Sequence, residues 1–142
     1  MKFLLLVFTI TCALLQVNTQ TKNSIMVGNV IISYTIRPTQ TDFFLLSNLD
    51  TSIDVNNAWL AMALNSNDKM NGGVAVVCSN YNGNSSVEHY YLNGYVPQLI
   101  DANVPGTGLS NVQVSVDDGW LVCSFTRENS FNNYVSNIDT GK

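Results

Sequence analysis

Few side chains in this sequence have the chemistry of a reactive or ligand-binding site. His89 is the single histidine among the 142 residues, so a Ser-His-Asp or Cys-His catalytic site would have to use it. It follows Glu88 in a strand-like run, where neighbouring side chains point to opposite faces. A surface or cross-strand histidine is the simpler interpretation, and we expect no enzyme active site and no catalytic residues.

Metal chemistry is also poorly supported by the composition. A zinc site needs three or four His, Cys or carboxylate ligands, and this chain cannot assemble one without using both of its late cysteines. The Asn and Asp residues at 65–71 fit no ordered calcium-loop spacing, and turn formation explains them. We therefore expect no metal site.

Met70 is the unusual residue of a polar stretch, NSNDKMNGG (65–73). A methionine in such a loop can fold back as a lid on the core. A thioether is also a soft axial ligand for haem iron, paired with histidine in electron-transfer cytochromes. The residues themselves leave both interpretations open.

Cys78 and Cys123 remain after Cys12 is assigned to an export signal. In an oxidising compartment the expected arrangement is one disulfide between them, and closing that loop would stabilise the fold by roughly 4 kcal/mol. Two separate buried thiols are the alternative.

The chain begins like an exported protein. Lys2 precedes the apolar run FLLLVFTITCALL, which is too short to span a bilayer, and we assign residues 1–19 to a signal peptide and 20–142 to one domain. Removing Lys2 leaves five basic against ten acidic side chains, which argues against nucleic acid as a partner. No later run is long enough for a transmembrane helix, so we expect a secreted protein. Asn84-Ser85-Ser86 is its N-glycosylation sequon.

The rest of the sequence is a series of short strand-like runs separated by turn residues, which is typical of a β-sandwich. Two runs, 58–64 and 74–78, are continuously apolar and are expected to be central strands. Pro97 suggests an edge strand, and Asp118-Gly119 predicts a tight turn. The expected strands lie within 24–36, 42–49, 56–65, 73–79, 86–92, 95–100, 110–116 and 120–126, about eight in all.

Three segments in this order, NNAWLAMALNSNDKMNGGVAVVC, SVEHYYLNGY and DGWLVCSFTR, resemble the DOMON domain. The similarity extends over roughly residues 25–130 and is closest to the version in ferric-chelate-reductase-like proteins. It implies an immunoglobulin-like sandwich of about ten strands that binds haem b or sugars, often next to a membrane cytochrome of the b561 type.

The resemblance also implies an axial pair for haem, a loop methionine and a histidine on a late strand. Met70 occupies the first position. His89 is not at the second, and the chain ends at Lys142 before the region that would supply it, so we expect the last strands to be missing. His89 is only a weak candidate ligand.

Three functions follow as hypotheses. The first is a secreted, non-catalytic module that binds haem or carbohydrate in the cleft of the sandwich. The second is an electron-transfer haem domain that partners a ferric-chelate reductase or b561-type cytochrome. The third is a structural or adhesive protein that pairs with another β-domain through an open edge. Aromatic residues could line the cleft, although core packing is the role that we favour for most of them: Trp59, Trp120, Tyr90, Tyr91 and Tyr95.

Overall fold

The computed structural model of the chain describes residues 22–49, 53–65 and 70–130. The predicted signal peptide and the tail from residue 131 lie outside these described residues. Within the described part, no helix is long and apolar enough to cross a membrane.

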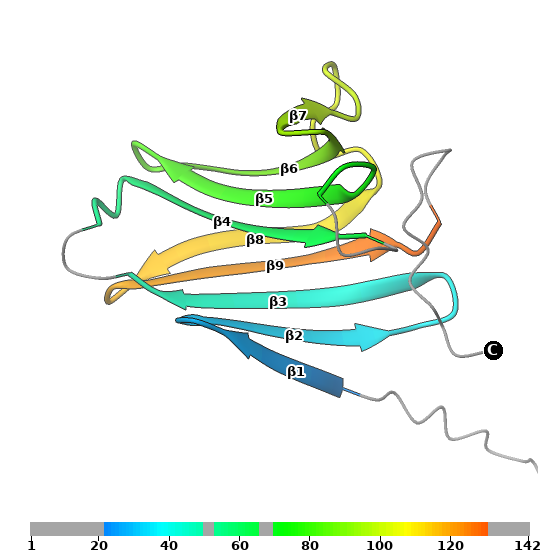
Figure 1. Cartoon of the computed structure of the whole chain (residues 1–142). Coiled ribbons are helices and arrows are strands. Elements are labelled where there is room, and N and C mark those ends of the chain that lie inside the picture. Colours follow the sequence, from blue (N-terminus) through cyan, green and yellow to red (C-terminus); the bar gives the residue numbers. More distant parts are fainter. Residues whose placement is uncertain (1–21, 50–52, 66–69, 131–142) are drawn as a thin grey trace, which may run out of the picture.

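Nine antiparallel strands in the described residues form two sheets that pack face to face (Figure 1). The first sheet has the order β1-β2-β3-β9-β8 and the second β4-β5-β6-β7. This confirms the predicted all-β sandwich, with nine strands in place of about eight. The strands are β1 (Lys22–Val27), β2 (Val30–Ile36), β3 (Gln40–Asn48), β4 (Asn57–Leu64), β5 (Val74–Tyr81), β6 (Asn84–Asn93), β7 (Val96–Leu99), β8 (Leu109–Asp117) and β9 (Trp120–Glu128).

Tight turns join several neighbouring strands, including the turn predicted at Asp118-Gly119. Asp118 and Gly119 have φ values of 45° and 77° between β8 and β9, and Asn82 and Gly83 have 49° and 79° between β5 and β6. Two successive positive φ values are characteristic of the type I′ hairpin turn, which favours Asn-Gly and Asp-Gly.

The core lies between the two sheets and is crossed by the predicted disulfide. Cys78 on β5 is bonded to Cys123 on β9, with a Cα–Cα distance of 6.3 Å. Both cysteines are fully buried. Because β5 and β9 belong to different sheets, the cystine holds the two layers together directly. Around it pack Phe43, Leu45, Leu49, Ala58, Leu60, Met62, Val76, Leu121 and Phe125.

The prediction of two central strands is half right. β5 lies between β4 and β6, as expected, but β4 is an edge strand of its sheet. Its side chains alternate between buried and exposed, with Leu60 and Met62 buried and Ala61 and Ala63 exposed. Alanine is small enough to occupy an exposed position at little cost, so the run reads as fully apolar without being buried on both faces.

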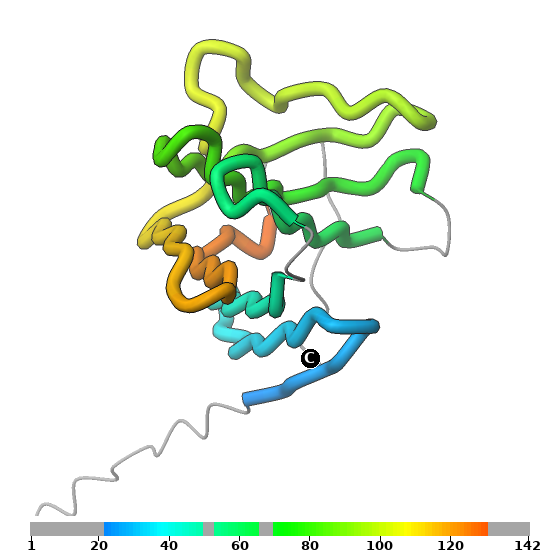
Figure 2. Tube along the Cα trace, turned by 90° about the vertical axis from the view of Figure 1, so that its left-hand side faces the viewer, coloured from blue at the N-terminus to red at the C-terminus, as the bar shows by residue number. Residues whose placement is uncertain are grey.

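Burial falls steadily toward the β1 side of the first sheet. Leu45, Ile32 and Ile25 are register partners on β3, β2 and β1, and their exposure rises from 0% at Leu45 to 50% at Ile25. The second sheet therefore stops covering the first before β1 is reached. Figure 2 shows the hairpin of β1 and β2 at one end of the molecule, far from the yellow-green β6 and β7.

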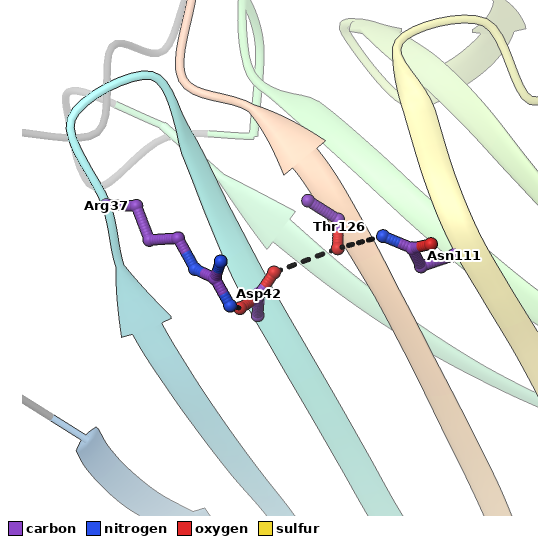
Figure 3. Close-up of polar contacts among 4 residues, drawn as sticks. All are labelled: Arg37, Asp42, Asn111 and Thr126. Atoms are coloured by element: carbon purple, nitrogen blue, oxygen red, sulfur yellow. Dashed lines mark hydrogen bonds and ion pairs between the residues drawn. The ribbon is translucent and has the colours of Figure 1, made fainter. Parts of the chain in front are cut away.

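The outer face of the first sheet carries a row of polar side chains across four strands (Figure 3). Arg37 forms an ion pair with Asp42. The Thr126 hydroxyl donates to Asp42 Oδ1 at 2.9 Å and accepts from Asn111 Nδ2 at 3.2 Å. The row links the end of β2 to β3, β9 and β8, and we interpret it as a structural tie.

Candidate functional site

An apolar groove opens where β4 meets the uncovered inner face of β2. Its volume is about 330 Å³, within the usual range for ligand pockets of roughly 300–1,000 Å³. Its walls come from β1, β2 and β3 on one side and β4 on the other. The lining residues are Ile25, Ile32, Tyr34, Ile36, Thr41, Phe43, Met62, Ala63, Leu64 and Asn65.

Strand alternation explains why this groove is apolar. Ile32, Tyr34 and Ile36 are spaced two residues apart on β2, so all three point to the same face. Ser33 and Thr35, between them, point to the other face. This alternation is visible in the sequence, and it is the signal that could have revealed the groove.

Met70 lies close to one end of the apolar groove. Asn65, which lines the groove, donates from Nδ2 to the Asn71 carbonyl at 3.2 Å. The Gly73 amide donates to the Met70 carbonyl, also at 3.2 Å. Met70 is 57% exposed and is not among the residues that line the groove, so it is not a buried core plug.

A second groove lies at the other half of β4 and has different chemistry. It has a volume of about 510 Å³. Trp59 lines it and is 69% exposed. The expectation that this tryptophan packs in the core is therefore wrong. We call it the amide-rich groove, because Asn29 and Asn57 accompany Trp59 there. Its other lining residues are Val30, Ser47, Leu49, Ile53, Ala58, Leu60 and Ala61.

The other aromatic candidates line neither groove. Tyr95 is 94% exposed and Trp120 is also exposed, while Tyr90 and Tyr91 are partly buried on β6. The expectation that most of these side chains belong to the core is therefore wrong. Tyr95 and Trp120 lie at turns and Tyr90 on the outer face of β6, whereas Tyr91 shares the inward face with His89 but is only partly covered. An aromatic-rich run does not say which face is covered.

Comparison with known families decides the affiliation of this sandwich. The model of the DOMON domain matches residues 28–142. The chain belongs to the DOMON domain family. No curated protein and no solved structure matches it.

The two ring nitrogens of His89 in this DOMON domain are both occupied. His89 is fully buried on β6. Nδ1 lies 2.9 Å from the Thr107 carbonyl, so this nitrogen carries the proton and donates. Nε2 then accepts from Arg127 Nε at 3.4 Å. Burial is the main cause that lowers the pKa of His89, and the Arg127 charge lowers it further, against an opposing effect of the bond to Thr107.

The backbone of His89 also fixes the segment between β7 and β8. Its amide donates to the Pro105 carbonyl at 2.8 Å, and its carbonyl accepts from the Ile100 amide at 3.0 Å. Together with the ring bond to Thr107, these contacts give His89 a structural role at this edge. His89 therefore contacts the other sheet through Arg127, and the segment between β7 and β8 covers it.

Haem is a ligand that the DOMON family implies, and the described residues fit it only in part. The apolar walls suit a porphyrin, and Met70 offers one soft ligand. A second axial bond from His89 would require its Nε2 to leave Arg127. Among the described residues, no three His, Cys, Asp or Glu side chains are grouped to hold a metal ion.

The sequon residue Asn84 is exposed as the first residue of β6, next to the Asn82-Gly83 turn. An adjacent recess is formed by Ser85, Ser86, Val87 and residues 112–115 of β8. The sequon is thus presented on a hairpin end, where an attached glycan would extend away from the sandwich.

Proposed function

We propose that this DOMON domain is a non-catalytic binding module that holds a flat, largely apolar ligand of the haem type in the apolar groove. The observation that supports it is the alternating row on β2, which faces β4 across a groove while Met70 lies close to the end of that groove. An apolar cleft with a few polar groups at its rim is the common form of a small-molecule site. Bound haem would supply a redox-active iron, and the chain would supply apolar walls and a thioether.

The test is a haem titration of the purified protein followed by visible absorption. We expect a Soret band that shifts and saturates near one equivalent. Met70→Ala should abolish or strongly weaken this binding while barely changing the melting temperature of the ligand-free protein. An unchanged free-haem spectrum in the wild type would refute the proposal.

Carbohydrate binding is the second candidate, and the amide-rich groove supports it. An exposed indole offers a flat surface for the CH face of a sugar ring, while Asn29 and Asn57 can both donate and accept hydrogen bonds to hydroxyls. Trp59→Ala should then remove binding in a glycan-array or calorimetric assay. Binding that is unaffected by this change would exclude the amide-rich groove as the sugar site.

An electron-transfer role beside a membrane cytochrome, and closeness to ferric-chelate-reductase domains, stay predictions. The electron-transfer role requires a six-coordinate haem, for which His89 would have to exchange Arg127 for iron. A low-spin spectrum that His89→Gln abolishes would support this function. A spectrum that is unchanged in His89→Gln would contradict it.

We further propose that the chain is exported and glycosylated at Asn84. The Cys78–Cys123 disulfide supports an oxidising compartment, and the exposure of Asn84 makes it accessible to the transferase. Secretion from cells with a mass shift that Asn84→Gln removes is the expected result. A secreted product of unmodified mass would contradict glycosylation.

A further inference from the structure

The sequence contains three Asn-Gly pairs, Asn71-Gly72, Asn82-Gly83 and Asn93-Gly94, and each is at or next to a turn. In such a pair the backbone nitrogen of the glycine can attack the side-chain carbonyl carbon of the asparagine, because glycine has no Cβ to hinder the approach. This reaction removes the side-chain amide without an enzyme. The three pairs are equivalent in local sequence, so the fold decides which of them reacts.

Two of the three glycine amides are held by hydrogen bonds. The Gly72 amide donates to the Leu92 carbonyl at 2.8 Å, and the Gly94 amide donates to Asn71 Oδ1 at 2.9 Å. An amide nitrogen has to lose its proton before it can attack, and a hydrogen bond holds that proton in place. The second contact also holds the Asn71 side chain. The fold therefore protects the pairs at Asn71 and Asn93.

The third pair, Asn82-Gly83, has no such protection. Both residues are exposed in the turn between β5 and β6. Among the described contacts, neither the Asn82 side chain nor the Gly83 amide forms a hydrogen bond. No atom would lie within 4 Å of a Cβ built on Gly83, so there is room for the ring to close. The same holds at Gly72 and Gly94, so the hydrogen bonds, not the space, distinguish the three pairs.

We propose that Asn82 is a site of spontaneous modification, at which the chain converts to aspartate and isoaspartate through a succinimide. A bond forms between the Gly83 nitrogen and Asn82 Cγ, and the bond from Cγ to Nδ2 breaks. Ammonia leaves with the proton that the Gly83 nitrogen loses. Water then adds to one of the two ring carbonyls. Opening at one carbonyl gives aspartate, and opening at the other gives isoaspartate, in which the main chain runs through the former side chain.

The modified turn would contact one wall of the amide-rich groove. The Asn82 amide donates to the Asn56 carbonyl at 2.7 Å, and Asn80 Nδ2 donates to the Val55 carbonyl at 2.9 Å. The turn thus holds the segment that leads to Asn57, which lines that groove. Isoaspartate lengthens the main chain by one methylene group, which shifts the turn against this segment. Both products also add a negative charge close to the sequon.

The first test is peptide mapping by mass spectrometry while the purified protein is kept in a mildly alkaline buffer. We expect Asn82 to convert at least about fivefold faster than Asn71 and Asn93, which is the effect of one typical hydrogen bond on a rate. The rate at Asn82 should rise with pH, because the attacking nitrogen must be deprotonated. In guanidinium chloride all three sites should convert at similar rates, because the contacts that distinguish them are then lost.

The second test removes one of the protecting contacts. Asn71→Ala takes away the acceptor of the Gly94 amide, so conversion at Asn93 should rise at least about fivefold, while conversion at Asn82 stays as in the wild type. Asn65→Ala is the matched control. It removes a bond from a side chain to the same loop but leaves the acceptor of Gly94 in place, so conversion at Asn93 should not change.

Conversion at Asn71 or Asn93 as fast as at Asn82 in the folded protein would overturn the proposal. So would an Asn82 that stays intact while the unfolded chain converts, or equal effects of Asn71→Ala and Asn65→Ala on Asn93. None of these results bears on haem or sugar binding by the unmodified protein, so this proposal and the proposed function can fail separately.

Discussion

The two flanks of the sandwich are built differently. On the flank formed by β6, β8 and the segment between β7 and β8, polar contacts join the layers. Arg127 lies on the inner side of β9 and contacts His89, which in turn bonds to Thr107. On the flank formed by β1, β2 and β4, no comparable tie is present among the described residues, and the apolar and amide-rich grooves open there. The first flank also has a recess, between β6 and β8.

This difference indicates which flank of the fold can bind a ligand. In the first flank, Arg127 and His89 fill inward positions and bond to each other, which reduces the cost of burying polar side chains. In the second flank the inward positions of β2 are apolar and only partly covered. Ligand binding can therefore use the open flank without disturbing the contacts that hold the sheets together.

The largest expected effect comes from breaking the covalent tie between the sheets. Cys78→Ser, Cys123→Ser and the double variant should each lower the free energy of unfolding by roughly 4 kcal/mol, since each removes the same cross-link. Urea unfolding under oxidising conditions measures this. Losses in the two single variants that add up in the double variant would show that the sulfurs act separately.

A smaller effect on stability is expected from the titration of His89 as the pH is lowered. The folded-state pKa of His89 lies below its ordinary value of 6.5, so below about pH 6.5 the unfolded chain binds the proton first. Stability should then fall with decreasing pH, by at most about 1.4 kcal/mol per pH unit, until the folded-state pKa is reached. Thermal unfolding between pH 7.5 and pH 5 measures the slope.

His89→Gln provides the comparison for this flank. Glutamine can still donate to Thr107 but does not gain a proton, so the slope near pH 6 should be reduced in the variant. An identical slope in both proteins would mean that His89 does not titrate on unfolding in this range.

The smallest effect concerns Tyr90 on the outer side of β6. Its hydroxyl donates to Glu88, and this bond raises the pKa of Tyr90 to about 12. The unfolded chain loses this proton near pH 10, so the contribution to stability is present below pH 10 and is lost as the pH rises toward 12. Tyrosinate absorbance in the wild type and in Glu88→Gln measures it, and equal titration curves would refute the contact.

Local pattern was enough to predict much of the fold. The turn at Asp118-Gly119, the edge strand at Pro97 and the pairing of Cys78 with Cys123 all depend on a few neighbouring residues or on cysteine number. The central position of 58–64 was wrong because an apolar run containing three alanines fits an edge strand equally well. Which strand lies at an edge is decided by pairing, not by composition.

The site was less predictable, for a related reason. Met70 was correctly placed in a loop, but the groove beside it depends on where β4 stops covering β2. The burial of His89 depends on Arg127, which is 38 residues away in sequence and belongs to the other sheet. Neither relation can be read from the spacing of residues along one strand.

The most direct test of ligand binding at the open flank is a comparison of Ala63→Glu with Ala61→Glu. Both alanines are exposed on β4, but Ala63 lines the apolar groove and Ala61 the amide-rich groove. Neither change should alter stability by more than about 0.5 kcal/mol. We predict that Ala63→Glu weakens haem binding at least about tenfold, while Ala61→Glu binds haem like the wild type. Equal affinities in the two variants, or a loss in Ala61→Glu alone, would contradict the account.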